Sequence, residues 1–209
     1  MAYDFKKEQK ELYRPGPGAS IVNVPAMNFL AVRGRGNPND EGGEYKVAIA
    51  LQYPVAYALR MSYKTDYVID GFFAYVVPPL EGFWWQPGVD GVDDKDALRW
   101  VSAIRVPDFI RQKDVDWAVD RVTQKKGKDF SAVEFLTIEE GLCVQAMHVG
   151  SFDTEPETVK MMSDYATSAG YVVDFGPQRW HHEIYLSDPS KVAPEKMRTV
   201  IRHPVRPAQ

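Results

Sequence analysis

Apolar residues recur with a helical spacing in the first third of the chain. Four of them are spaced four residues apart in the stretch 44–63: Val47, Leu51, Val55 and Leu59. This spacing predicts an amphipathic helix. Pro54 lies inside the same stretch, and we expect it to kink or split the helix because proline removes a hydrogen bond and clashes with the preceding turn.

Other apolar runs predict strands, separated by turns rich in glycine and proline. The predicted strands are 26–36, 71–77, 99–107, 132–138, 139–152, 171–175 and 181–186. Further helices are predicted over about 114–126 and 154–170, where Thr154 and Glu157 have the spacing of a capping box. The stretch 78–94 reads as a loop that contains at most a short strand, and 193–202 as a short last helix or turn.

The order of these elements suggests an internal duplication. The strand ending at Gly34 leads through a polar loop to a helix and two strands, and the strand ending at Gly150 does the same. We therefore predict an α+β fold made of two strand-helix-strand-strand modules related by a pseudo-twofold axis. Helices would cover one face of each small antiparallel sheet, and the opposite faces would enclose a central ligand groove.

The predicted organisation is an N-terminal arm followed by a single domain. Its parts are the polar arm 1–19, the domain 20–209, a first module at about 24–107, a connecting helix at about 114–126, a second module at about 133–189 and the terminal turn or helix 193–202.

Composition and charge exclude several classes of protein. The net charge is −4 and no basic stripe is present, which argues against direct nucleic-acid binding. The single Cys143 excludes an intrachain disulfide and a cysteine zinc site. The N-terminus lacks the apolar core of a signal peptide, and no run reaches the ~18 apolar residues of a membrane span. We expect a cytoplasmic protein that does not bind membranes.

The segment "RWHHEIYLSDP", residues 179–189, places a carboxylate within an apolar strand pattern. Alternate residues of a strand share a face. Three residues are expected on one face: His181, Glu183 and Tyr185. Three are expected on the other: His182, Ile184 and Leu186. We expect the apolar pair to lie under helices and Glu183 and Tyr185 to line the groove.

Glu183 is the main candidate for chemistry. In a half-dry aromatic site it would attract cations or, with a raised pKa, act as an acid or base. The alternatives are a solvated glutamate at a sheet edge and a glutamate paired with a neighbour such as Arg179. A metal site and a cofactor are not expected, because His181 and His182 face opposite ways and the sequence has no HExxH or carboxylate–histidine motif.

Aromatic residues are abundant, with 5 Trp, 11 Tyr and 10 Phe. Trp84 and Trp85 are neighbours in an extended stretch, so one of the two is expected to be buried. Each aromatic residue alone is explained by core packing, but together with an inward acid they suggest a cage for a flat or cationic ligand. The predicted ligand-binding set is Tyr53, Tyr57, Tyr75, Trp84, Trp100 and Met147.

Several motifs spread over 24–205 resemble those of the stand-alone GyrI-like small-molecule-binding proteins. They are "VPAMNFLAVRGRGNPN", "PLEGFWW", "IRVPDF", "EEGLCVQAMHVGSFDTEP" and "HHEIYLSDPSKVAPEKMRTVIRHPV". The resemblance implies paired modules around a ligand groove, with an inward glutamate at Glu183 and cage aromatics at Trp84 and Trp100. Tyr53 and Tyr57 carry over less directly, because Pro54 lies between them. No metal or cofactor is implied.

The resemblance also implies a function. One subfamily of stand-alone members hydrolyses the cyclopropane of duocarmycin- and yatakemycin-type DNA alkylators, which protects the cell. We therefore expect Glu183 and Tyr185 to be catalytic and the partner to be a hydrophobic or cationic xenobiotic, bound by a monomer or homodimer. Two alternatives remain: a small-molecule binding protein without hydrolytic activity, and an interaction protein that docks on an enzyme as a gyrase inhibitor does.

Overall fold

The computed structural model describes residues 2–16, 18–89, 91–92 and 94–208. Residues 1 and 17 of the expected arm, residues 90 and 93 of the expected loop and residue 209 lie outside this description. The chain divides into two compact units. Unit 1 comprises Met1–Asp4, Met27–Pro78 and Trp84–Ile138, and unit 2 comprises Phe5–Ala26, Pro79–Phe83 and Glu139–Gln209.

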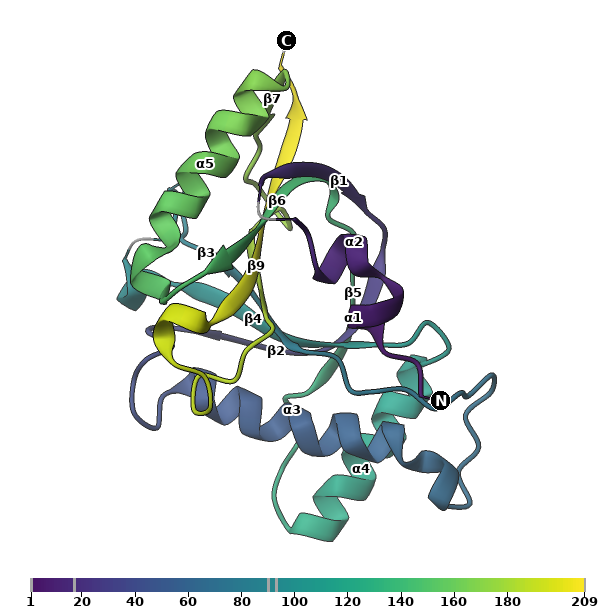
Figure 1. Cartoon of the computed structure of the whole chain (residues 1–209). Coiled ribbons are helices and arrows are strands. Elements are labelled where there is room, and N and C mark those ends of the chain that lie inside the picture. The colour runs from purple at the N-terminus through teal and green to yellow at the C-terminus, as the bar shows by residue number, and fades with distance from the viewer. Residues whose placement is uncertain (1, 17, 90, 93, 209) are drawn as a thin grey trace. The chain divides into compact units, whose positions relative to one another are not determined.

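Unit 1 is a mixed α/β body whose strands pair antiparallel. Its elements are β2 (Met27–Arg35), α3 (Glu44–Arg60), β4 (Arg99–Val106), α4 (Gln112–Lys126), β5 (Glu134–Ile138), and 3-10 turns at Ser62–Lys64 and Lys95–Ala97. Strand β2 lies between β4 and β5, with Ala31 opposite both Ala103 and Glu134. Helix α3 packs on β2 and β4 and contacts α4 (Figure 1). Its stripe at Leu51, Val55 and Leu59 is buried, whereas Val47 is exposed.

Two predictions for unit 1 differ from the structure. Helix α3 continues through Pro54 without a break, so the predicted split is absent. The stretch 71–77 is irregular rather than a strand, and its regular pairing is a single bridge between Tyr75 and Tyr3. Its aromatic side chains pack among themselves, as Phe72 and Tyr75 do at 6.5 Å between ring centroids, so tertiary packing and not a ladder orders this segment.

Unit 2 contains a sheet in the order β1-β6-β9-β8, with β7 also pairing with β9. Its elements are α1 (Phe5–Glu8), α2 (Lys10–Tyr13), β1 (Ser20–Val24), β6 (Gly141–Val149), α5 (Glu155–Ser168), β7 (Tyr171–Val173), β8 (His181–Tyr185), β9 (Arg198–Pro207), and 3-10 turns at Phe152–Thr154 and Pro194–Lys196. Strand β3 (Leu80–Trp85) gives its first residues to unit 2 and Trp84 and Trp85 to unit 1.

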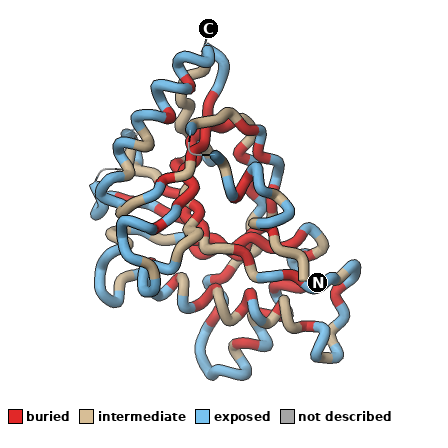
Figure 2. Tube along the Cα trace, viewed as in Figure 1, coloured by how far each residue is buried: buried red, intermediate tan, exposed pale blue. Residues whose placement is uncertain are grey.

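Helix α5 covers one face of the unit 2 sheet. Its Met162 and Ala166 pack against Val144 of β6 and Ile201 of β9, all fully buried. Figure 2 shows the buried residues following the strands while the outer side of α5 is exposed. The same face carries Glu183.

Both ends of the chain differ from expectation. The arm predicted over 1–19 is not simply polar, because α1 and α2 bury Phe5, Leu12 and Tyr13. The helix predicted over 193–202 was wrong beyond the turn Pro194–Lys196, since Arg198–Pro207 forms β9. Strand β9 pairs with β6 on one side and β8 on the other, and ladder pairing outweighs local helix propensity.

The predicted α+β class is confirmed. The order strand, helix, strand, strand occurs in β2-α3-β3-β4 and again, with the short β7 added, in β6-α5-β8-β9. The pseudo-twofold axis and the groove stay predictions. Among the described residues, no helix is both long and apolar enough to span a membrane.

Candidate functional site

The register of β8 against β9 decides which way Glu183 points. Glu183 lies opposite Ile201, and directly opposed residues of an antiparallel pair project from the same face. Because Ile201 packs under α5, Glu183 lies on the helix-covered face of the sheet. The predicted grouping of His181 with Glu183 was right, but the prediction that Glu183 faces away from the helices was wrong: α5 covers the face of Glu183, whereas Ile184 lies opposite Val200, on the other face.

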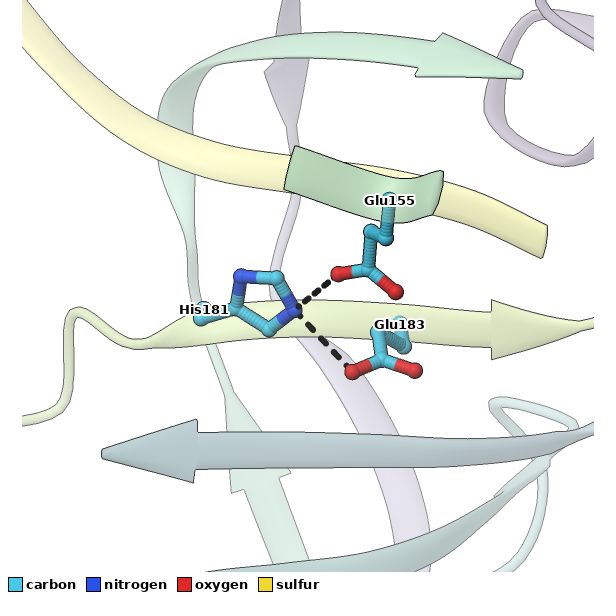
Figure 3. A group of neighbouring side chains, drawn as sticks. All are labelled: Glu155, His181 and Glu183. Atoms are coloured by element: carbon cyan, nitrogen blue, oxygen red, sulfur yellow. Dashed lines mark hydrogen bonds and ion pairs between the residues drawn. The ribbon is translucent and has the colours of Figure 1, made fainter. Parts of the chain in front are cut away.

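Three side chains meet on this face at the start of α5 (Figure 3). Nε2 of His181 is 3.0 Å from Oε1 of Glu183 and 3.2 Å from Oε1 of Glu155. The side chains of His181, Glu155 and Glu183 are 3, 12 and 13% exposed. A largely buried Glu183 is not the solvated edge glutamate of the first alternative. The second alternative is right that Glu183 pairs with a neighbour, but the partner is His181, because Arg179 pairs with Asp174 at 3.0 Å.

Glu155 was not predicted from the sequence. Helix α5 begins at this residue, and Thr154, the predicted cap, makes no side-chain capping bond. An acid in the first helical turn is ordinarily explained by the helix dipole, so the sequence alone carries no signal that Glu155 contacts β8.

In this cluster, burial and hydrogen-bonding partners shift the pKa values in opposite directions. Burial alone would lower the pKa of His181, but its hydrogen bonds to Glu155 and Glu183 outweigh this and raise the pKa to about 9. Burial raises the pKa of Glu183, and the charge of Glu155 raises it further, while His181 and the Tyr185 hydroxyl lower it. The net effect is a raised pKa, so Glu183 binds a proton more readily than an exposed glutamate.

His203 of β9 completes the cluster. Its Nε2 lies 2.7 Å from Nδ1 of His181. Burial and the neighbouring His181 hold the pKa of His203 well below its usual value, so this ring is neutral. A neutral His203 accepts the Nδ1 hydrogen of His181 and thereby orients the ring.

The ligand atoms of Glu155, His181 and Glu183 all lie within 4.8 Å of one another, a spacing that a metal ion could bridge. The expectation that no histidine–carboxylate cluster exists was therefore wrong, because α5 brings Glu155 in from a distant part of the sequence. In the described arrangement Nε2 of His181 is already hydrogen-bonded to both carboxylates. The geometry is that of a cluster that shares a proton.

His182 forms a second cluster on the opposite face of β8. Its Nδ1 is 3.0 Å from Glu140 and its Nε2 is 3.0 Å from Glu81. Arg202 lies 3.0 Å from the other oxygen of Glu140. The Tyr13 hydroxyl donates to Glu81 at 3.1 Å. Burial would raise the pKa of Glu140, but His182 and Arg202 outweigh it and lower the pKa to about 2.

Unit 1 contains a cluster of buried aromatic rings. The Tyr45 ring of α3 lies 4.9 Å from Trp84 and 5.0 Å from Trp100, edge-on to the latter. Trp84 is buried and Trp85 only partly so, as expected of neighbours in a strand. Nε1 of Trp100 is buried and, in the described part of the chain, makes no hydrogen bond. Tyr45 was not predicted, although its position on the apolar side of α3 could have indicated it.

The other predicted binding residues are dispersed. Tyr57 on α3 is 51% exposed and Tyr53 is partly buried. Tyr75 is buried in a separate aromatic group with Phe72 and Phe109. Met147 lies opposite Val200, as Ile184 does, so it projects from the face opposite Glu183. Tyr185 does lie with Glu183, and its ring is 6.1 Å from Phe152, edge-on.

Comparison with known proteins agrees with this fold. The sequence model of the GyrI-like small molecule binding domain matches residues 19–206. The chain belongs to the GyrI-like family. As a GyrI-like domain it binds small molecules.

Solved structures extend the comparison. The crystal structure of a hydrolase from Listeria innocua is 44% identical, with a TM-score of 0.89 over 98% of this GyrI-like chain and all of the other. An uncharacterized conserved protein from Listeria innocua is 45% identical, with a TM-score of 0.91 over 98% of this chain and all of the other. The EcmrR C-terminal domain, at 14% identity and a TM-score of 0.57 over 91% and 98% of the two chains, shares the fold alone. No curated protein matched.

Proposed function

We propose that this GyrI-like chain binds flat, largely apolar xenobiotics and hydrolyses the cyclopropane of duocarmycin- and yatakemycin-type alkylators. Glu183 would be the base. The observation that carries the proposal is the condition of Glu183: a carboxylate only 13% exposed, with a raised pKa, held beside a histidine that is charged at neutral pH. A base of this kind is suited to accept a proton from water near neutral pH.

The reaction asks little of the protein. Water adds its oxygen to the methylene carbon of the ring, the strained carbon–carbon bond breaks, and its electron pair moves through the dienone to make a phenolate. Glu183 takes one proton from the water, and the phenolate takes up a proton to give the phenol. The protein therefore needs to position water and substrate and to provide the base.

Two further observations support the proposal. The Listeria innocua protein that is 44% identical over 98% of this chain is described as a hydrolase. Buried rings such as Tyr45, Trp84 and Trp100 are of the type that stacks on flat ligands. Tyr185, which hydrogen-bonds Glu183, would hold the carboxylate in orientation.

Replacing Glu183 tests the proposal. Glu183→Gln should lower turnover of a cyclopropane alkylator by about 10²–10⁴-fold, the usual contribution of a general base. Ligand affinity should change little, because glutamine keeps the shape. Mass spectrometry of the hydrated product measures turnover, and quenching of tryptophan fluorescence measures binding. The control is Glu157→Gln, since Glu157 is an exposed glutamate in the first turn of α5, outside the cluster of Glu155, His181 and Glu183.

Full turnover in Glu183→Gln would rule out Glu183 as the base.

The second candidate function is binding without hydrolysis, which the description of the family as small-molecule binding favours. In that case addition of the ligand would quench the tryptophan fluorescence of the wild-type protein, but no hydrated product would form at any pH.

A further inference from the structure

His181 and His182 offer an internal comparison. Each ring is bracketed by two carboxylates at hydrogen-bond distance, His181 by Glu155 and Glu183 and His182 by Glu81 and Glu140. The two clusters lie on opposite faces of one strand and are similarly buried.

The clusters differ in charge. Around His182, Arg202 adds a second positive charge, so two cations balance two anions. Around His181, neither carboxylate pairs with a lysine or arginine among the described residues, so one imidazolium faces two anions. Titratable groups with perturbed pKa values gather at functional sites, and the excess negative charge around His181 makes this cluster the candidate for proton transfer.

The hydrogens of His181 can be assigned from its partners. Its Nδ1 donates to His203, which burial keeps neutral. Its Nε2 then carries the single remaining hydrogen, which faces Glu183 at 3.0 Å and Glu155 at 3.2 Å. One hydrogen can point fully at only one of two acceptors, so the two carboxylates share it.

We propose that Glu155 is a positioning residue of the hydrolytic site: it keeps the charge of His181 paired at the moment when Glu183 takes a proton from water. The inference rests on the proposed function. In that step an O–H bond of water breaks, an O–H bond forms on Glu183, and the oxygen of the water joins the carbon. Glu183 becomes neutral, and without Glu155 the His181 cation would be buried with no anion beside it.

Glu155 also acts on Glu183 before the step. Its negative charge raises the pKa of Glu183, which makes Glu183 the stronger base. The groups that face His181 are His203 from β9, Glu155 from α5 and Glu183 from β8, and Tyr185 hydrogen-bonds Glu183.

The test is the pH profile of kcat/KM for Glu155→Gln. Removing the negative charge lowers the pKa of both Glu183 and His181. The acid limb of the profile, set by Glu183, and the alkaline limb, set by His181, should therefore both move to lower pH by about one unit. Glu155→Asp restores the charge and should move the profile back. A residue with a purely structural role would reduce the height of the profile and leave its limbs in place, and that result would overturn the proposal.

A second readout does not depend on turnover. In NMR titrations, the His181 ring should change charge near pH 9 in the wild type and at lower pH in Glu155→Gln. An unchanged His181 midpoint would overturn the role of Glu155 in pairing His181, even if Glu183→Gln were inactive.

If turnover is absent in the wild type but the midpoint shifts, the proposed function fails while the pairing stands. If EDTA abolishes turnover and Zn²⁺ restores it, the cluster is a metal site and the proton-sharing assignment is wrong.

Discussion

Gly34 is the residue that lets the Trp100 indole lie against β2. A Cβ built on Gly34 would come within 2.1 Å of Cη2 and 2.3 Å of Cζ2 of Trp100. Such distances are far below van der Waals contact, so any side chain here would displace the ring. The absence of a side chain at Gly34 is therefore a condition for the aromatic cluster of unit 1.

Gly34→Ala should destabilise the protein by about 1–3 kcal/mol, the usual cost of overpacking a core. Urea unfolding followed by circular dichroism measures the change. Gly176→Ala is the matched control, since a Cβ there has no neighbour within 4 Å. Equal stability of the two variants would contradict the tight packing of Trp100.

Prediction from sequence worked unevenly at the scale of residues. Alternation along β8 correctly paired His181 with Glu183, because side-chain direction in a strand has a period of two. It could not tell which face α5 covers, since that depends on the register with β9. The role of Glu155 could not be predicted for a similar reason: its contact with His181 exists only after α5 has packed.

At the scale of elements, strand β9 is held between β6 and β8 by a buried polar network as well as by its ladders. Arg202 projects from β9, reaches Glu140 at 3.0 Å, and donates to Gln145 of β6 at 3.2 Å and to the Leu12 carbonyl at 2.8 Å. With this side chain fully buried, its removal would take a hydrogen bond from every partner, and the Glu140 carboxylate would keep only His182 among the described residues.

Arg202→Met should lower the free energy of unfolding by about 3–5 kcal/mol, because it takes one of its two cationic partners from the buried carboxylate of Glu140. Arg206→Met on the same strand is the control: its partner is Asp174 at 3.3 Å and its side chain is 51% exposed, so about 0–1 kcal/mol is expected. Chemical denaturation of both variants gives the comparison. Similar losses in the two would mean that the network adds nothing beyond a surface pair.

Periodicity predicted the long helices and most strands, because burial of one face imposes a regular spacing. It failed where contacts between distant residues, and not a local pattern, determine the structure. The stretch 71–77 is rich in aromatic residues and was read as a strand, but its rings pack on Phe109 and not in a ladder. The stretch 198–202 was predicted as part of a short helix or turn, but it pairs with β6 and β8.

At the scale of the whole molecule, the duplicated order of elements was predictable because it is written in the chain itself. The position of a ligand site was not, because it depends on contacts between distant residues. The groove expected from the sequence therefore stays a prediction, and Tyr53, Tyr57, Tyr75, Trp84, Trp100 and Met147 stay predicted binding residues.

Stability should depend on pH through both histidine clusters. The pKa of Glu140 is lowered from 4.5 to about 2, so its contribution is present above pH 4.5 and is lost as the pH falls towards 2. The pKa of His181 is raised from 6.5 to about 9, so its contribution is complete below pH 6.5 and is lost as the pH rises through 9. Urea midpoints across this range should fall at both ends.

Matched variants separate the two limbs. Glu140→Gln should flatten the acid limb and His181→Asn the alkaline limb, with each variant leaving the other limb in place. An alkaline limb that persisted in His181→Asn would contradict the charge assigned to this ring.

The burial of Tyr13 has a practical consequence for anyone who trims or tags this protein. The first turns of the chain look like a dispensable leader, yet the Tyr13 hydroxyl and the Leu12 and Glu11 carbonyls end on Glu81, Arg202 and Gln145. Cutting the chain after residue 13 would leave a guanidinium, a carboxylate and an amide short of partners in the interior of unit 2. An expression vector for this protein should therefore keep residues 11–13 and carry its affinity tag at the C-terminal end.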